Sequence, residues 1–206
     1  CYAVKVYWRD VRDTRDRLAT EFDSLTFMWS HGLRCIPAPV FCDKVAGFAV
    51  YEYVQGERVG GLRMETADIG QVVRFLGKLR EMSHIESARS LAAASDACFS
   101  VGDIVRGVRR RILRLREVSD DGARHRDMKT FLGHELEPFF EQAVGNAIRS
   151  LEQTGRTIDS VLSLEERTLS PSDYGFHNAL RRSDGSLVFV DFEYFGWDDP
   201  AKMVVD

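Results

Sequence analysis

The spacing of the apolar residues changes along this chain, and that change limits the folds available to it. Up to Val54, short β-branched and aromatic runs flank a single amphipathic segment. Beyond Gly61 the apolar period becomes about 3.6 residues and persists for roughly a hundred residues, and short strand patterns return after Thr168. We therefore expect an α+β fold with a small β-rich lobe over residues 1–55 and a larger, mainly helical lobe over residues 56–206.

Each lobe has a predicted order of elements. The first lobe should contain a strand, a helix that ends near His31-Gly32, and a hairpin. The second should contain three helical stretches, the last interrupted near Pro138, and a strand hairpin. The expected strands are 2–8, 40–42, 47–54, 178–181 and 186–192, and the expected apolar helix stripes run over 18–29, 69–79, 104–115 and 131–151.

The composition is that of an ordinary globular protein. The 206 residues carry a net charge of −4, which gives no general attraction to nucleic acid or to an anionic membrane. No apolar run approaches the roughly 20 residues of a membrane helix, and the N-terminus lacks a signal-peptide pattern. We therefore expect a soluble, cytoplasmic protein without nucleic-acid or membrane partners. Because the chain opens on Cys1 rather than Met, we interpret it as a fragment of a longer protein.

The cysteines and histidines argue against a zinc site. No two cysteines have the two-residue spacing of zinc knuckles, and no two histidines form a helical ligand pair. The sequence also lacks the Gly-x-Ser-x-Gly pattern of a serine hydrolase. Reduced cysteines that serve packing are the expected state.

The stretch from Ser170 to Glu193 carries the most chemical information. It contains Asp173, Asn178 five residues later, and Asp191 directly after the apolar run Leu-Val-Phe-Val. Kinases use such a set, because a carboxylate must lie near the acceptor hydroxyl while Asn and Asp oxygens hold the magnesium that bridges the phosphates. The protein-kinase signature has the same five-residue step, followed by a metal-binding Asp-Phe-Gly.

Together with elements elsewhere in the chain, these residues resemble the aminoglycoside phosphotransferase and choline kinase family, which has the protein-kinase-like two-lobe fold. Tyr2-Ala-Val-Lys5-Val looks like the strand with the phosphate-contacting lysine, and Glu21 looks like its helix partner. Glu52-Tyr53-Val54 looks like the hinge that receives the adenine. The tail from Gly196 to Asp206 resembles the Gly-x-x-Asp-Pro tail of the family.

The resemblance implies transfer of the γ-phosphoryl group of ATP to a hydroxyl of a small molecule, with ATP and Mg²⁺ as cofactors. It implies that Asp173 is the catalytic base and that Lys5, Glu21, Glu52, Tyr53 and Val54 serve nucleotide binding. Asn178, Asp191 and Glu193 are the implied metal ligands, although Glu193 either reaches the metal through water or only braces the loop. The identity of the acceptor and the oligomeric state stay open.

Two departures from the family pattern favour an alternative. Pro171-Ser172-Asp173 stands where the family has His-Gly-Asp, so the histidine that braces the loop is missing, and no glycine-rich loop precedes Lys5. The stretch Gly56–Gly61 follows the hinge and matches no phosphate-binding pattern. The alternative is a catalytically silent kinase-like module that binds a partner through its helical lobe.

Overall fold

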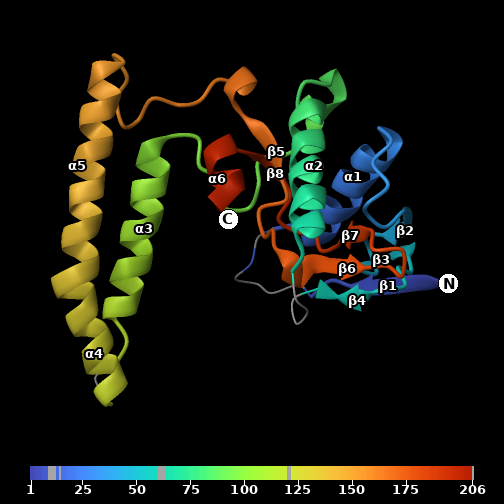
Figure 1. Ribbon diagram of the computed structural model, residues 1–206, viewed down its shortest axis with the longest axis horizontal. Coiled ribbons are helices and arrows are strands. Elements are labelled where there is room, and N and C mark those ends of the chain that lie inside the picture. The colour runs from blue at the N-terminus through green and yellow to red at the C-terminus, as the bar shows by residue number, and fades with distance from the viewer. Residues whose placement is uncertain (9–12, 14, 60–63, 120–121, 206) are drawn as a thin grey trace. The chain divides into compact units, whose positions relative to one another are not determined.

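The computed structural model forms two compact units (Figure 1). The first comprises residues 1–97 and 163–206, and the second comprises residues 98–162. The expected lobe boundary after residue 55 falls inside the first unit and stays a prediction. Gly60, Gly61 and Asp206 lie outside the described residues. The structure describes residues 1–8, 13, 15–59, 64–119 and 122–205.

A three-stranded antiparallel sheet opens the first unit, as predicted. Its strands are β1 (Tyr2–Val6), β2 (Pro39–Asp43) and β3 (Phe48–Glu52), in the order β1-β3-β2. The β2–β3 turn is closed by Asp43, whose carboxylate accepts hydrogen bonds from two backbone amides of the turn. Gly47 completes that turn with a φ of 76°, a conformation that residues with a Cβ rarely adopt.

Helix α1 (Arg17–Ser30) packs on this sheet and confirms the predicted amphipathic segment. Its first turn is capped by Asp16, which accepts a hydrogen bond of 3.0 Å from the Ala19 amide. Leu18 and Leu25 are buried on its apolar face. Glu21 lies on the same face and is only 4% exposed, so this carboxylate needs partners within the protein.

Helix α2 (Thr66–Met82) buries a stripe that differs from the expected one. Phe75, Leu79 and Met82 are buried, whereas Ile69 and Val73 are more than half exposed. One residue step turns a helix by about 100°, so apolar residues beside the buried stripe face outward. The prediction of a helix is therefore confirmed, whereas the predicted buried face is partly wrong.

A second sheet holds the hairpin that was expected after Thr168. It has the order β4-β6-β7, with β4 (Glu57–Arg58), β6 (Ala179–Arg181) and β7 (Leu187–Phe189). Strand β4 was expected to be a loop. Gly56 permits its approach, because a Cβ there would lie 2.8 Å from the Arg181 carbonyl oxygen.

Strands β5 (Thr168–Ser170) and β8 (Gly196–Asp198) form an antiparallel pair that the sequence did not predict. Trp197 also forms a parallel bridge with Ala93 on the other edge of β8. Gly196 makes this possible, because a Cβ at that position would lie 2.4–2.5 Å from the backbone of residues 92–94. Helix α6 (Pro200–Val205) follows β8, and the short helical turns of the unit are η2 (Glu86–Ser90), η4 (Leu164–Glu166) and η5 (Phe176–Asn178).

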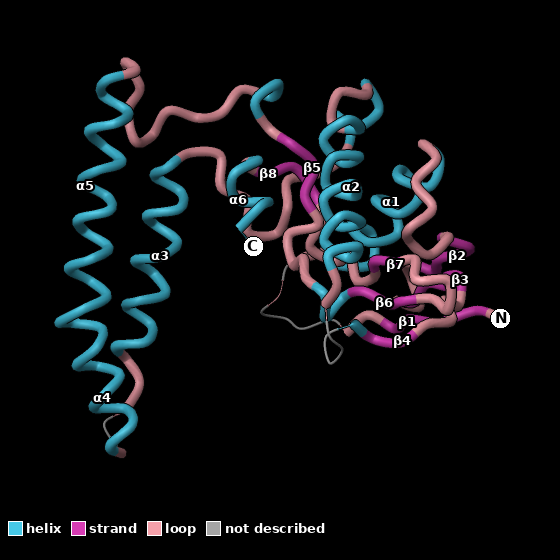
Figure 2. Tube along the Cα trace, viewed as in Figure 1, coloured by secondary structure: helices cyan, strands magenta, loops and turns pink. Residues whose placement is uncertain are grey.

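The described part of the second unit contains helices and loops without strands (Figure 2). The π-helical turn η3 (Leu132–Leu136) lies directly before Pro138, so the irregularity expected there is a π turn rather than a break. Within the described residues, no helix is both long and apolar enough to cross a membrane. The helices of this unit are α3 (Val101–Arg116), α4 (Ala123–Phe131) and α5 (Glu137–Gln153).

Ion pairs join α3 to α5. Arg109 contacts Glu141 at 2.9 Å and Arg116 contacts Glu137 at 2.5 Å, so these two arginines of α3 serve packing between helices. Phe139 was expected in the core but is 70% exposed on α5. A pair of helices leaves most of each helix surface uncovered, which explains how a large apolar residue at the expected period stays outside.

Candidate active site

Lys5 lies at the centre of a set of charged side chains from three segments of the chain. Its Nζ atom lies 2.7 Å from Glu21 Oε2, 2.7 Å from Asp191 Oδ1 and 3.5 Å from Glu193 Oε2. We call these four residues the lysine cluster. Since the contacts join β1 to α1 and to the segment after β7, the fold brings together residues up to 188 positions apart, Lys5 and Glu193.

Glu21 is the most fully satisfied member of the lysine cluster. Besides the Lys5 ammonium, it accepts a hydrogen bond of 2.6 Å from the Tyr7 hydroxyl and one of 3.2 Å from the Phe192 amide. The Tyr7 proton is used in this way, so Tyr51, whose oxygen is 2.7 Å away, donates to Tyr7. The buried carboxylate is thereby fixed before any ligand arrives.

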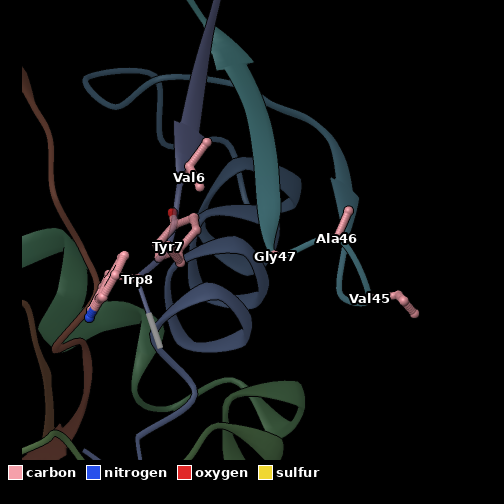
Figure 3. Close-up of a pocket in the computed structure, with 6 residues that line it drawn as sticks. All are labelled: Val6, Tyr7, Trp8, Val45, Ala46 and Gly47. Carbon is pink, nitrogen blue, oxygen red and sulfur yellow. The ribbon is translucent and has the colours of Figure 1, made fainter. Parts of the chain in front are cut away.

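Tyr7 and Tyr51 were not among the predicted site residues. Tyr7 follows Lys5 by two positions, which places both on one face of an extended segment, and this alternation was an available signal. Burial and the charge of Glu21 raise the pKa of the Tyr7 phenol, so it stays a donor at all ordinary pH values. Figure 3 shows Tyr7 beside Val6 and Trp8, where they line a hollow of 540 Å³ at the end of β1; the described residues that line it carry no charged side chain.

Opposing effects act on the Lys5 ammonium. Its burial favours the neutral amine, but the charge of Glu21 and the hydrogen bonds to Asp191 and Glu21 outweigh burial and raise the pKa of Lys5. The lysine is therefore a permanent cation at physiological pH. Such a cation stabilises phosphate oxygens in its neighbourhood.

Glu193 is held from two sides. Arg17 Nη1 donates to its Oε1 at 2.8 Å, and Lys5 lies 3.5 Å from its Oε2. Arg17 also pairs with Asp13 at 2.6 Å, and neither of these two residues was predicted to be near the site. These contacts favour the bracing role among the two that the sequence left open for Glu193.

Asp191 is the accessible carboxylate of the cluster. Its side chain is 40% exposed, against 13% for Glu193 and 5% for Glu21. Oxygen atoms of the three carboxylates lie within 4.8 Å of one another. Asp191 has a φ of 70°, in the left-handed region that Asp and Asn tolerate better than most residues.

The loop that carries Asp173 lies between β5 and β6, and we call residues 171–178 the Asp173 loop. Ser172 has a φ of 67°, and the Asp173 amide donates to the Pro171 carbonyl at 2.9 Å. Asn178 donates through Nδ2 to the Asp173 carbonyl at 3.1 Å, and its own carbonyl accepts from the Val190 amide at 2.9 Å. Asn178 therefore ties the Asp173 loop to the residue before Asp191.

An aromatic side chain anchors the Asp173 loop in the core. The Tyr174 ring lies 5.7 Å from both Phe75 and Phe189, which are themselves stacked at 4.4 Å. Its hydroxyl is buried without a hydrogen-bond partner among the described residues. Asp173, which is adjacent in sequence, keeps a half-exposed side chain.

The expected hinge residues lie at the end of β3. Glu52 and Tyr53 line a polar hollow of 780 Å³ together with Gln55, Gly56, Glu57 and residues 181–184. Glu52 accepts a hydrogen bond from the Ala38 amide at 3.2 Å and lies 3.4 Å from Arg182. Val54 follows Tyr53 in sequence but does not line this hollow. The contact of the three residues with a nucleotide stays a prediction.

Comparison with solved structures identifies the fold that carries this site. Spectinomycin phosphotransferase APH(9)-Ia, in complex with ADP and spectinomycin, matches 98% of this chain with a TM-score of 0.60 at 14% identity. The ADP-bound aminoglycoside phosphotransferase APH(2'')-Ib also matches 98% of it, with a TM-score of 0.58 at 21% identity. This chain has the aminoglycoside phosphotransferase fold.

The aminoglycoside phosphotransferase fold is a kinase-like α+β fold, which confirms the predicted fold class. An aminoglycoside phosphotransferase from Alicyclobacillus acidocaldarius matches 97% of the chain with a TM-score of 0.56 at 15% identity. The chain spans 58% to 62% of the length of these three structures. No protein-family model matches the sequence, and no curated protein does either.

Proposed function

We propose that this chain carries the active site of an ATP-dependent phosphotransferase that acts on a hydroxyl group of a small molecule. The observation that supports this most strongly is the lysine cluster. A lysine held 2.7 Å from a buried glutamate and 2.7 Å from an accessible aspartate, on segments far apart in sequence, is the kinase arrangement for nucleotide phosphates. The fold of the solved nucleotide-bound phosphotransferases supports the same conclusion.

In this proposal Lys5 neutralises phosphate oxygens of ATP, and Glu21 keeps its ammonium in place. Asp191 and Asn178 would hold Mg²⁺, which prefers oxygen ligands. The donors fit that ion, because Asp191 is the most exposed carboxylate of the cluster and the Asn178 side-chain oxygen has no partner among the described residues. When bound, Mg²⁺ supplies positive charge that stabilises the phosphates during transfer.

Asp173 is the proposed base. One of its carboxylate oxygens contacts His177, and the other has no partner among the described residues. That second oxygen is available to accept a hydrogen bond from the acceptor hydroxyl and to take its proton late in the transfer. The protein thus contributes positioning and charge rather than covalent chemistry.

The test is a calorimetric titration of ATP into the full-length protein, with and without Mg²⁺. We expect Mg²⁺-dependent binding that weakens at least about tenfold in Asp191→Asn, since the amide keeps the shape but removes the charge. Asp159→Asn is the matched control, because Asp159 lies in the helical unit and its exposed carboxylate pairs with Arg106 at 2.9 Å.

The opposite result has a defined meaning. Absence of binding in both titrations would overturn the proposed activity and favour the catalytically silent module. Binding that is indifferent to Asp191→Asn would remove this residue from the metal site and leave the nucleotide site in place.

A further inference from the structure

The Asp173 loop contains a contact that the motif comparison did not indicate. His177 Nε2 lies 3.3 Å from Asp173 Oδ1, four residues back in sequence. Both side chains are exposed, at 61% for His177 and 50% for Asp173. The imidazole reaches back because Phe176–Asn178 forms the single 3₁₀ turn η5, which brings position 177 over the start of the loop.

Gly175 makes room for this ring. A Cβ at position 175 would lie 2.6 Å from His177 Nδ1 and 2.7 Å from Cε1. The backbone there is extended, with a φ of −179°, so space rather than backbone conformation requires the glycine. Any larger residue would displace the imidazole and with it the contact to Asp173.

The remaining contacts of the loop define what the imidazole contributes. Asn178 holds the Asp173 carbonyl, and the Tyr174 ring anchors the loop on Phe75 and Phe189. These contacts fix the backbone but leave the terminal torsion of the Asp173 side chain free, and such torsions have broad minima. His177 is the one side chain of the described structure in contact with the Asp173 carboxylate.

We propose that His177 is a positioning residue that orients the Asp173 carboxylate for the acceptor hydroxyl. This inference rests on the proposed function. A proton on Nε2 is donated to Oδ1, which turns Oδ2 toward the open side of the loop. The family has a histidine two residues before the aspartate, where this chain has Pro171; here His177 is the histidine that contacts the Asp173 side chain.

The test compares His177→Ala, His177→Gln and wild type in steady-state turnover of Mg-ATP, with gentamicin, spectinomycin or water alone as acceptor. We expect kcat to fall about ten- to a hundredfold in His177→Ala, with KM for ATP and thermal stability unchanged. Glutamine carries an N–H donor on a side chain of similar reach, so His177→Gln should recover most of the rate. His84→Ala, in an exposed loop after α2, is the matched control.

A second variant probes the same contact without removing the histidine. Gly175→Ala should lower kcat to a similar degree, because its methyl group displaces the ring. Combined with His177→Ala it should add almost nothing, since both changes remove one contact. Additive losses would show that Gly175 acts separately from His177.

The outcomes separate the two proposals. Turnover that is present in wild type and unchanged in His177→Ala overturns the positioning role alone. An equal loss in His177→Ala and His177→Gln together with a lower melting temperature would make the contact structural. Absence of both Mg-ATP turnover with these acceptors and Mg-ATP binding in the calorimetric titration overturns the proposed function, and the role of His177 with it.

Discussion

The lysine cluster and the Asp173 loop are built in opposite ways. Glu21 is buried and receives three donors from two distant parts of the chain, whereas Asp173 is half-exposed and its contacts come from within five residues. Long-range contacts form only once the fold is complete, so the cluster has its geometry before a ligand arrives. The loop keeps one carboxylate oxygen open. We infer that the protein is rigid at the proposed nucleotide site and open at the proposed acceptor site.

The largest expected effect is the loss of turnover on substitution of Asp173, in the open Asp173 loop. Asp173→Asn should lower turnover about a thousandfold, because the amide cannot accept the hydroxyl proton. Its affinity for Mg-ATP should stay within about a factor of three, since the lysine cluster is untouched. Single-turnover kinetics and calorimetry on the same preparation measure both quantities. A variant with the wild-type rate would show that Asp173 is not the base.

The next largest effect is a loss of stability on substitution of Glu21, in the rigid lysine cluster. Glu21→Ala should lower the free energy of unfolding by about 3 kcal/mol, because Lys5 and the Tyr7 hydroxyl lose their buried acceptor. Asp23→Ala on the same helix is the control; its carboxylate is more than half exposed and lies 3.6 Å from Lys44. It should change stability by less than about 0.5 kcal/mol. Equal losses in urea unfolding would contradict the contrast between a rigid and an open half.

Alkaline pH provides a smaller test of the cluster. The folded-state pKa of Lys5 is raised above 10.5, so its ion pairs contribute fully below that pH and are lost as the pH rises through the folded-state pKa. The stability difference between wild type and Lys5→Met should therefore be constant from about pH 8 to 10 and shrink at higher pH. Urea unfolding at several pH values measures it. A difference that does not change up to the highest accessible pH would argue against the raised pKa.

The smallest expected effect concerns the anchor of the loop. Tyr174→Phe removes a buried hydroxyl without a partner among the described residues and should leave stability unchanged or raise it by up to about 1 kcal/mol. Tyr51→Phe removes a hydroxyl bonded to Tyr7 and should cost about 1 kcal/mol. Thermal unfolding of the two variants compares them directly. A clear loss in Tyr174→Phe would mean that its hydroxyl has a partner.

The sequence predicted those parts that have a local signature. Strand β1, helix α1 and the β2–β3 hairpin follow from apolar periodicity, and Asp173, Asn178 and Asp191 follow from motif spacing. Placement of Lys5, Glu21 and Asp191 in one cluster came from the family resemblance. No local sequence pattern indicates that these three residues lie close together in space.

Other parts left no readable signal. Strands β4, β5 and β8 have two or three residues, too few for an alternation to be visible. Strands β6 and β7 are as short, but they flank the turn sequence Ser183-Asp184-Gly185, which indicates a hairpin. Arg17 and Tyr51 join the site through contacts across the fold, and charge or aromatic character alone does not distinguish them from surface or core residues. The role of His177 depends on the space left by Gly175, which only the three-dimensional arrangement reveals.

The two edges of β8 bind the two chain segments that lead into and out of the helical unit. One edge bonds to residues 92–94, just before the chain enters residues 98–162, and the other pairs with β5, just after the chain returns. The segment before the helical unit and the segment after it are therefore both hydrogen-bonded to β8, and Gly196 leaves the space that the approach of residues 92–94 requires. In topological terms the helical unit is an insertion between two segments that both bond to β8. The length and surface of the helical unit can therefore change during evolution without a change in the first unit, which contains the lysine cluster and the Asp173 loop.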